Sequence, residues 1–170
     1  MKTKDLVIIA TFVALLIAVQ WVLSAISGVE LVTVMLLAFC YVNGVKRSVI
    51  AATAFSLLRC FIFGFFPTVI ILYLIYYNVF AAIVGLIGNK LKNEYSIKNH
   101  IIIVIAALIL TVLFTVTDNI ITPILYAYTK SMTEAYWIAS LSTLVPHAIC
   151  SLATSLVLFF PLYKLFYTVK

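Results

Sequence analysis

Long apolar runs separated by short polar stretches make up almost the whole chain. The breaks between the runs hold glycine, proline or charged residues, as at Gly44, Pro67 and Pro123. A membrane-spanning helix needs about 20 predominantly apolar residues, so the pattern predicts six transmembrane helices in one compact domain, 1–170. The predicted spans are 5–24, 30–43, 48–63, 68–88, 100–121 and 135–163.

The second predicted helix, 30–43, is short. At 1.5 Å per residue, its roughly fourteen residues cover about 21 Å, which is less than the hydrocarbon thickness of a bilayer. We therefore expect this helix either to stop short of one membrane face or to be shielded by its neighbours.

The composition indicates that most of the protein is surrounded by lipid rather than by water. Hydrophobic residues make up 66% of the chain and charged residues 9%. A soluble domain cannot cover that much apolar surface, so an all-α, multi-pass protein of the cell membrane is predicted. A signal peptide is not expected, because the first apolar run is as long as a bilayer span.

The basic residues fall on one side of the predicted topology. They are Lys2, Lys4, Lys46, Arg47, Lys90, Lys92, Lys98, Lys164 and Lys170. Arg59 and Lys130 are the exceptions. The positive-inside rule therefore places both termini in the cytoplasm. Basic loops beside anionic lipid headgroups also explain the net charge of +6, so no nucleic-acid partner is expected.

Small residues form a ladder along the first helix at Ala10, Ala14 and Ala18. A step of four residues advances by only about 40° around a helix, so the three alanines share one stripe. Such a stripe lets a second helix approach closely in lipid. We interpret it as a docking face for another protein rather than as a seam within the chain, because the polar candidates lie on the later helices.

Four ionisable residues fall within the outer halves of the predicted helices: Glu30, Arg59, Asp118 and His147. An ionisable group inside a membrane is costly unless it is paired or wet, so each is a candidate functional residue. One interpretation is a water-accessible polar cavity that opens outward. The other is a structural ion pair of Arg59 with Glu30 or Asp118, together with a hydrogen-bonded histidine.

Tyrosines gather at the same predicted depth in the fourth helix. Tyr73 and Tyr77 are four residues apart and share a face, and Asn78 follows directly. Aromatic walls with a few polar groups suit a small planar ligand. The predicted substrate-binding residues are Glu30, Arg59, Tyr73, Tyr77, Asn78, Asp118, Asn119 and His147. Arg59 is predicted to bind a carboxylate or phosphate, because its planar guanidinium suits such groups.

Signatures of covalent chemistry do not occur in the sequence. It contains no HExxH, no GxSxG and no phosphate-binding lysine loop. Cys40, Cys60 and Cys150 lie apart within apolar runs and are interpreted as packing residues. We therefore expect neither an enzyme nor a bound cofactor or metal.

Three features together resemble the substrate-binding S component of energy-coupling factor (ECF) vitamin transporters. They are the alanine ladder, the segment VELVT at Val29–Thr33, and Pro146-His147 followed by LVLFFPLYKL at Leu156–Leu165. The resemblance covers essentially the full length. One departure concerns Ala148–Ser151, where related sequences carry a glycine-containing stretch, and it leaves the ligand's identity open.

The resemblance implies a function and partners. An S component binds a vitamin or related micronutrient in an outward pocket and docks through the first helix on a transmembrane T component, which two ATPases drive. Two alternatives stay open: a small membrane scaffold without a ligand, and an independent secondary transporter. The second is disfavoured because no internal inverted repeat is visible.

Overall fold

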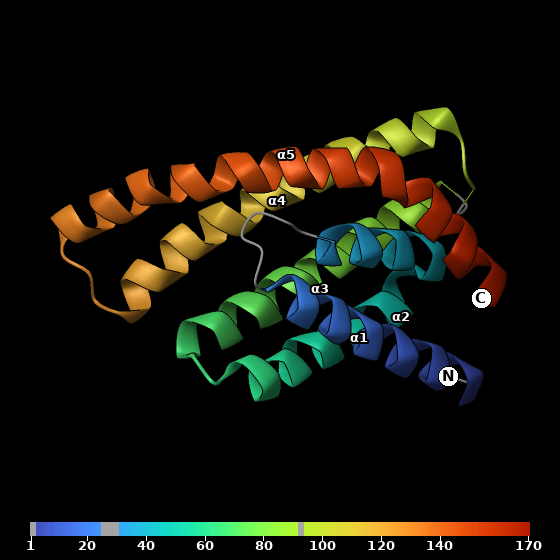
Figure 1. Ribbon diagram of the computed structural model, residues 1–170, viewed down its shortest axis with the longest axis horizontal. Helices are drawn as coiled ribbons and strands as arrows, with labels where there is room; N and C mark the ends of the chain where they lie inside the picture. The colour runs from blue at the N-terminus through green and yellow to red at the C-terminus, as the bar shows by residue number, and fades with distance from the viewer. Residues whose placement is uncertain (1–2, 25–30, 92–93) are drawn as a thin grey trace.

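The computed structural model describes residues 3–24, 31–91 and 94–170, and these ranges contain helices and no strand (Figure 1). All five helices are long and apolar enough to cross a membrane, as expected for an all-α, multi-pass membrane protein. The helices are α1 (Thr3–Leu23), α2 (Val32–Phe63), α3 (Pro67–Lys90), α4 (Ile97–Leu125) and α5 (Lys130–Val169).

The number of helices in the described part of the chain differs from the six expected. The predicted helices 30–43 and 48–63 are joined in α2, which has a break at Gly44 with φ of 72° and ψ of 176°. A positive φ of this size favours glycine. Figure 1 shows the chain reversing there, so that α2 has a first arm, 32–43, and a second arm, 45–63.

The first arm of α2 is the centre of the structure. Every residue from Val32 to Val42 is buried. Phe39 stacks on Phe12 of α1 with ring centroids 3.9 Å apart, and the ring of Phe166 of α5 meets both edge-on. The predicted short helix 30–43 corresponds to this arm, and its described residues are shielded by neighbouring helices. Shielding was one of the two outcomes expected from its length.

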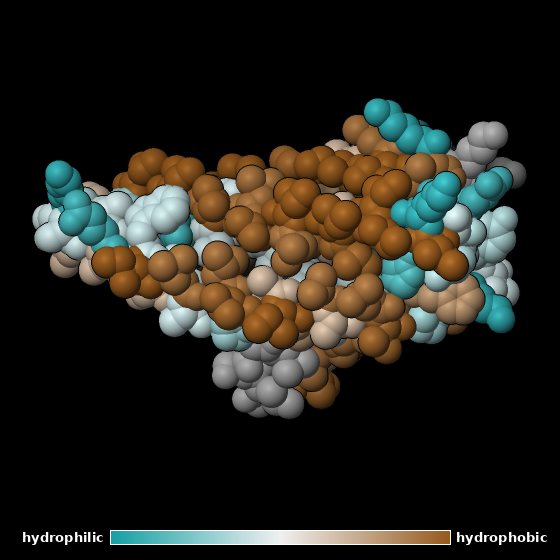
Figure 2. All heavy atoms as spheres, turned by 90° about the horizontal axis from the view of Figure 1, so that it is seen from above, coloured by the Kyte–Doolittle hydropathy of each residue, from teal (hydrophilic) through white to brown (hydrophobic). Residues whose placement is uncertain are grey.

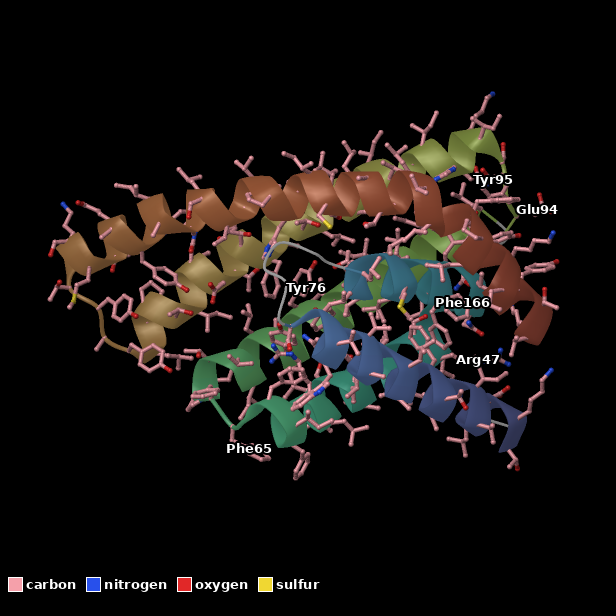
Figure 3. The ribbon with its side chains drawn as sticks, in the orientation of Figure 1. Arg47, Phe65, Tyr76, Glu94, Tyr95 and Phe166 are labelled. Atoms are coloured by element: carbon pink, nitrogen blue, oxygen red, sulfur yellow. The ribbon has the colours of Figure 1, made fainter. Side chains whose placement is uncertain are left out.

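The two ends of the described chain meet at one end of the molecule (Figure 1). Lys4 Nζ donates to the carbonyl of Lys170 at 3.2 Å, and Arg47 pairs with Asp5 at 2.7 Å. Arg47 and Glu94 also lie at this end (Figure 3). The two described termini and the turn that carries Arg47 therefore lie at the same end of the molecule.

The surface carries an apolar belt. Figure 2 shows hydrophobic side chains along the middle of one face, with hydrophilic residues concentrated toward the two ends. Large apolar side chains such as Ile109, Ile138 and Val157 are more than half exposed on α4 and α5. A belt of this kind is stable against lipid and would be unstable against water.

Gly85 of α3 allows the close approach of α3 to the break in α2. A Cβ atom on Gly85 would lie 2.8 Å from both the Cα and the N of Val45, and 3.0 Å from the carbonyl carbon of Gly44. Because these are backbone atoms, they cannot rotate away as a side chain does. The reversal of α2 is thus packed directly on α3.

Gly85→Val is expected to lower the free energy of unfolding by about 1–3 kcal/mol, the usual cost of overpacking a close contact. Thermal unfolding of the purified protein in detergent measures this effect. Leu86→Val is the control, because it places the same side chain at an exposed neighbouring position. Equal stability of the two variants would contradict the contact between Gly85 and Val45.

Candidate ligand-binding site

Two adjacent cavities lie between α3, α4 and α5, beside the start of α2. They share the lining residues Phe114 and His147, and we name them the inner and the outer compartment of one candidate site. The inner compartment has a volume of about 110 Å³ and is lined by Thr33, Tyr73, Tyr76, Tyr77, Thr111, Phe114 and His147. The outer compartment has a volume of about 360 Å³ and is lined by Phe114, Thr115, Asp118, Tyr136, Ala139, Ser140, Thr143 and His147.

Aromatic rings form the wall of the inner compartment. Tyr76, labelled in Figure 3, donates its hydroxyl to the carbonyl of Leu110 on α4 at 2.9 Å. Its ring lies 4.8 Å from that of Phe114 and 5.2 Å from that of Tyr77. The ring of Tyr77 also meets Phe55 of α2 edge-on at 5.3 Å. These contacts from three helices hold the wall in place.

Threonine hydroxyls add polar groups to the inner compartment, and the sequence prediction did not include them. Thr111 Oγ1 donates to Ser151 Oγ at 2.9 Å and so links α4 to α5. Thr33 lines the compartment from the start of α2. The signal for Thr111 is its spacing, because Thr111, Phe114 and Asp118 follow one another at helical steps of three and four.

Asp118 is the charged group of the outer compartment. Its Oδ2 accepts from the hydroxyl of Tyr136 on α5 at 2.7 Å, and its Oδ1 accepts from Thr122 Oγ1 at 2.7 Å. Hydrogen bonds to a carboxylate are stronger than neutral ones. Asp118 is therefore held in one orientation by donors from two helices.

His147 lies where the two compartments meet. It follows Pro146 within α5 and is half-buried. Among the described residues, neither ring nitrogen has a hydrogen-bond partner. A neutral imidazole offers one donor and one acceptor, so His147 can serve either kind of ligand group.

Arg59 lies next to Tyr73, which lines the inner compartment. Its guanidinium carbon is 3.9 Å from the ring centroid of Tyr73 and 5.0 Å from that of Phe63. It is not among the residues that line either compartment. The structure does not pair it with Asp118, and Glu30, the other predicted partner, lies outside the described residues.

The two predicted asparagines lie elsewhere. Asn78 Oδ1 accepts from Thr53 Oγ1 at 2.8 Å, so this side chain faces the second arm of α2. Asn119 is 3% exposed and donates to Ser140 Oγ at 2.7 Å. Of the predicted site residues, Tyr73, Tyr77, Asp118 and His147 are brought together, and their role in binding stays a prediction.

The alanine ladder lies on the side of α1 that faces away from the rest of the protein. Ala10, Ala14 and Ala18 are all exposed. The opposite face supplies the buried residues Ile9, Phe12, Val13, Leu16 and Ile17. The ladder is therefore not a seam within the described chain.

Comparison with known proteins finds no matching family model, no matching curated protein and no matching solved structure. A function is therefore inferred from the geometry of the site and the surfaces around it.

Tyr136→Phe is expected to lower the free energy of unfolding by about 1.5 kcal/mol, because it removes a hydrogen bond to the carboxylate of Asp118. Thermal unfolding in detergent measures the change. Tyr126→Phe is the matched control, since the Tyr126 side chain is about half exposed at 51% and the residue begins the turn between α4 and α5. A stability loss in the control alone would contradict the role assigned to Tyr136.

Proposed function

We propose that the protein is the substrate-binding S component of an ECF-type importer and binds a vitamin or related micronutrient. The observation that supports this most is the pair of adjacent cavities lined by aromatic and polar side chains of α2, α3, α4 and α5. Small-molecule sites are concave and combine aromatic walls with a few directed polar groups. In this proposal the protein does not catalyse a reaction.

In the proposed orientation both termini are cytoplasmic, and the site opens toward the outer face. The two arms of α2 then count as separate passes, which gives six in total. The basic residues near the meeting of Lys4, Arg47 and Lys170 support this orientation, because such residues collect on the cytoplasmic side.

The exposed alanine stripe on α1 is the proposed docking face for the transmembrane T component, which two ATPases drive. A smooth stripe allows close packing of a second helix in lipid. The stripe is separate from the binding site, since α1 supplies no residue to the lining of either compartment.

Ala14→Leu is expected to abolish co-purification with a co-expressed T component, because the larger side chain blocks close helix contact, while ligand binding by the isolated protein is retained. Leu15→Phe is the control, because this exposed position lies about 100° around the helix from Ala14. Lost ligand binding together with intact assembly would overturn the assignment of the stripe.

A membrane scaffold without a ligand is the second candidate. It is favoured by polar side chains that already join helices within the protein, such as Asn78 with Thr53 and Thr111 with Ser151. In that case the polar residues serve packing alone, and no small molecule stabilises the protein.

A thermal-stability screen of the purified protein against vitamins and nucleobases separates the two candidates. A ligand at a hundred times its dissociation constant raises the free energy of unfolding by about 2.7 kcal/mol. We expect one compound to do so, and His147→Ala to remove the effect with little change in stability without ligand. Ser142→Ala, on the exposed side of α5, is the control. The absence of any stabilising compound would favour the scaffold.

A further inference from the structure

The charges around the binding site constrain the kind of ligand it accepts. Among the described residues that line the two compartments, Asp118 is the one with a fixed charge, and neither lysine nor arginine is present. We propose that the ligand is a planar heteroaromatic compound with an amino group, neutral or cationic, rather than a carboxylate or phosphate. This inference rests on the proposed function.

The first support is the unused hydrogen-bonding capacity of Asp118. An ionised carboxylate has about four acceptor positions. Tyr136 and Thr122 occupy one on each oxygen. A donor on the ligand can use the remaining positions without breaking these bonds, and an ammonium or amino group is the donor that a carboxylate binds most strongly.

The second support is the position of Arg59. Its guanidinium carbon lies 3.9 Å from the ring centroid of Tyr73, and Arg59 is not among the residues that line either compartment. An anion placed there loses water without gaining a direct cationic partner, which is unfavourable. This proposal therefore differs from the expectation that Arg59 binds a carboxylate or phosphate.

The third support is the aromatic wall. Tyr76, Tyr77 and Phe114 line the inner compartment, and aromatic rings of this kind attract a cationic group. Along α4, Phe114 and Asp118 are four residues apart, which is about 6 Å. A ligand with its ring against Phe114 therefore reaches Asp118 with an amino group roughly one helical turn away.

Matched pairs of planar compounds test the charge preference on the purified, unmodified protein. Equilibrium binding is measured for pyridoxamine against 4-pyridoxate and for thiamin against thiamin monophosphate. We expect an amine member to bind at least about tenfold more tightly than its anionic partner. If neither pair binds, the charge of whichever compound stabilises the protein in the thermal screen decides: an anion overturns the proposal, and an amine supports it.

Asp118→Asn tests the role of the carboxylate. The variant keeps an oxygen acceptor for Tyr136 or Thr122, and we expect it to weaken binding of the amine ligand by about tenfold or more. Glu134→Gln is the matched control, because Glu134 is an exposed carboxylate near the start of α5 and does not line the site. Unchanged amine binding in Asp118→Asn would overturn the proposal.

These outcomes separate the two inferences. Tighter binding of an anionic compound overturns the charge preference and leaves the proposed function intact. The absence of binding by every compound in both experiments overturns the proposed function, and the charge preference with it.

Discussion

The reversal of the backbone at Gly44 is the constraint on which the rest of the structure depends. Gly44 is buried, and the peptide groups of a buried turn need hydrogen-bond partners from the protein. Ser48 Oγ donates to the carbonyl of Gly44 at 2.6 Å, and Lys170 Nζ donates to that of Val42 at 2.7 Å. The missing side chain at Gly85 lets α3 cover the turn.

The first arm of α2 also contributes to the candidate site. It begins at Val32 and is buried along its length. Thr33, at this start, lines the inner compartment together with side chains of α3, α4 and α5.

Apolar runs predicted most of the helix positions, because the length of an apolar run determines where a helix can lie in lipid. The predicted span 68–88 matches α3 closely, and Gly44 marks a real break in α2. The predicted depth placed Tyr77 and His147 at a similar level, and both line the inner compartment. The depth of a residue in the membrane does not determine the direction in which its side chain points around the helix axis. Asn78 follows Tyr77 directly, and its side chain is turned by about 100° toward Thr53. The sequence prediction did not include Thr111 for the same reason, because only its direction around the helix places it in the inner compartment.

The separation of α1 from the binding site has a consequence for how such a protein changes in evolution. The exposed alanines lie on a helix that supplies no lining residue, and the cavity lies among the other four helices. Substitutions that alter the shape of the cavity therefore leave the surface of α1 unchanged. Under the proposed function, one lineage can diversify its ligands while its descendants keep a common external surface on α1, so that ligand choice and assembly change independently.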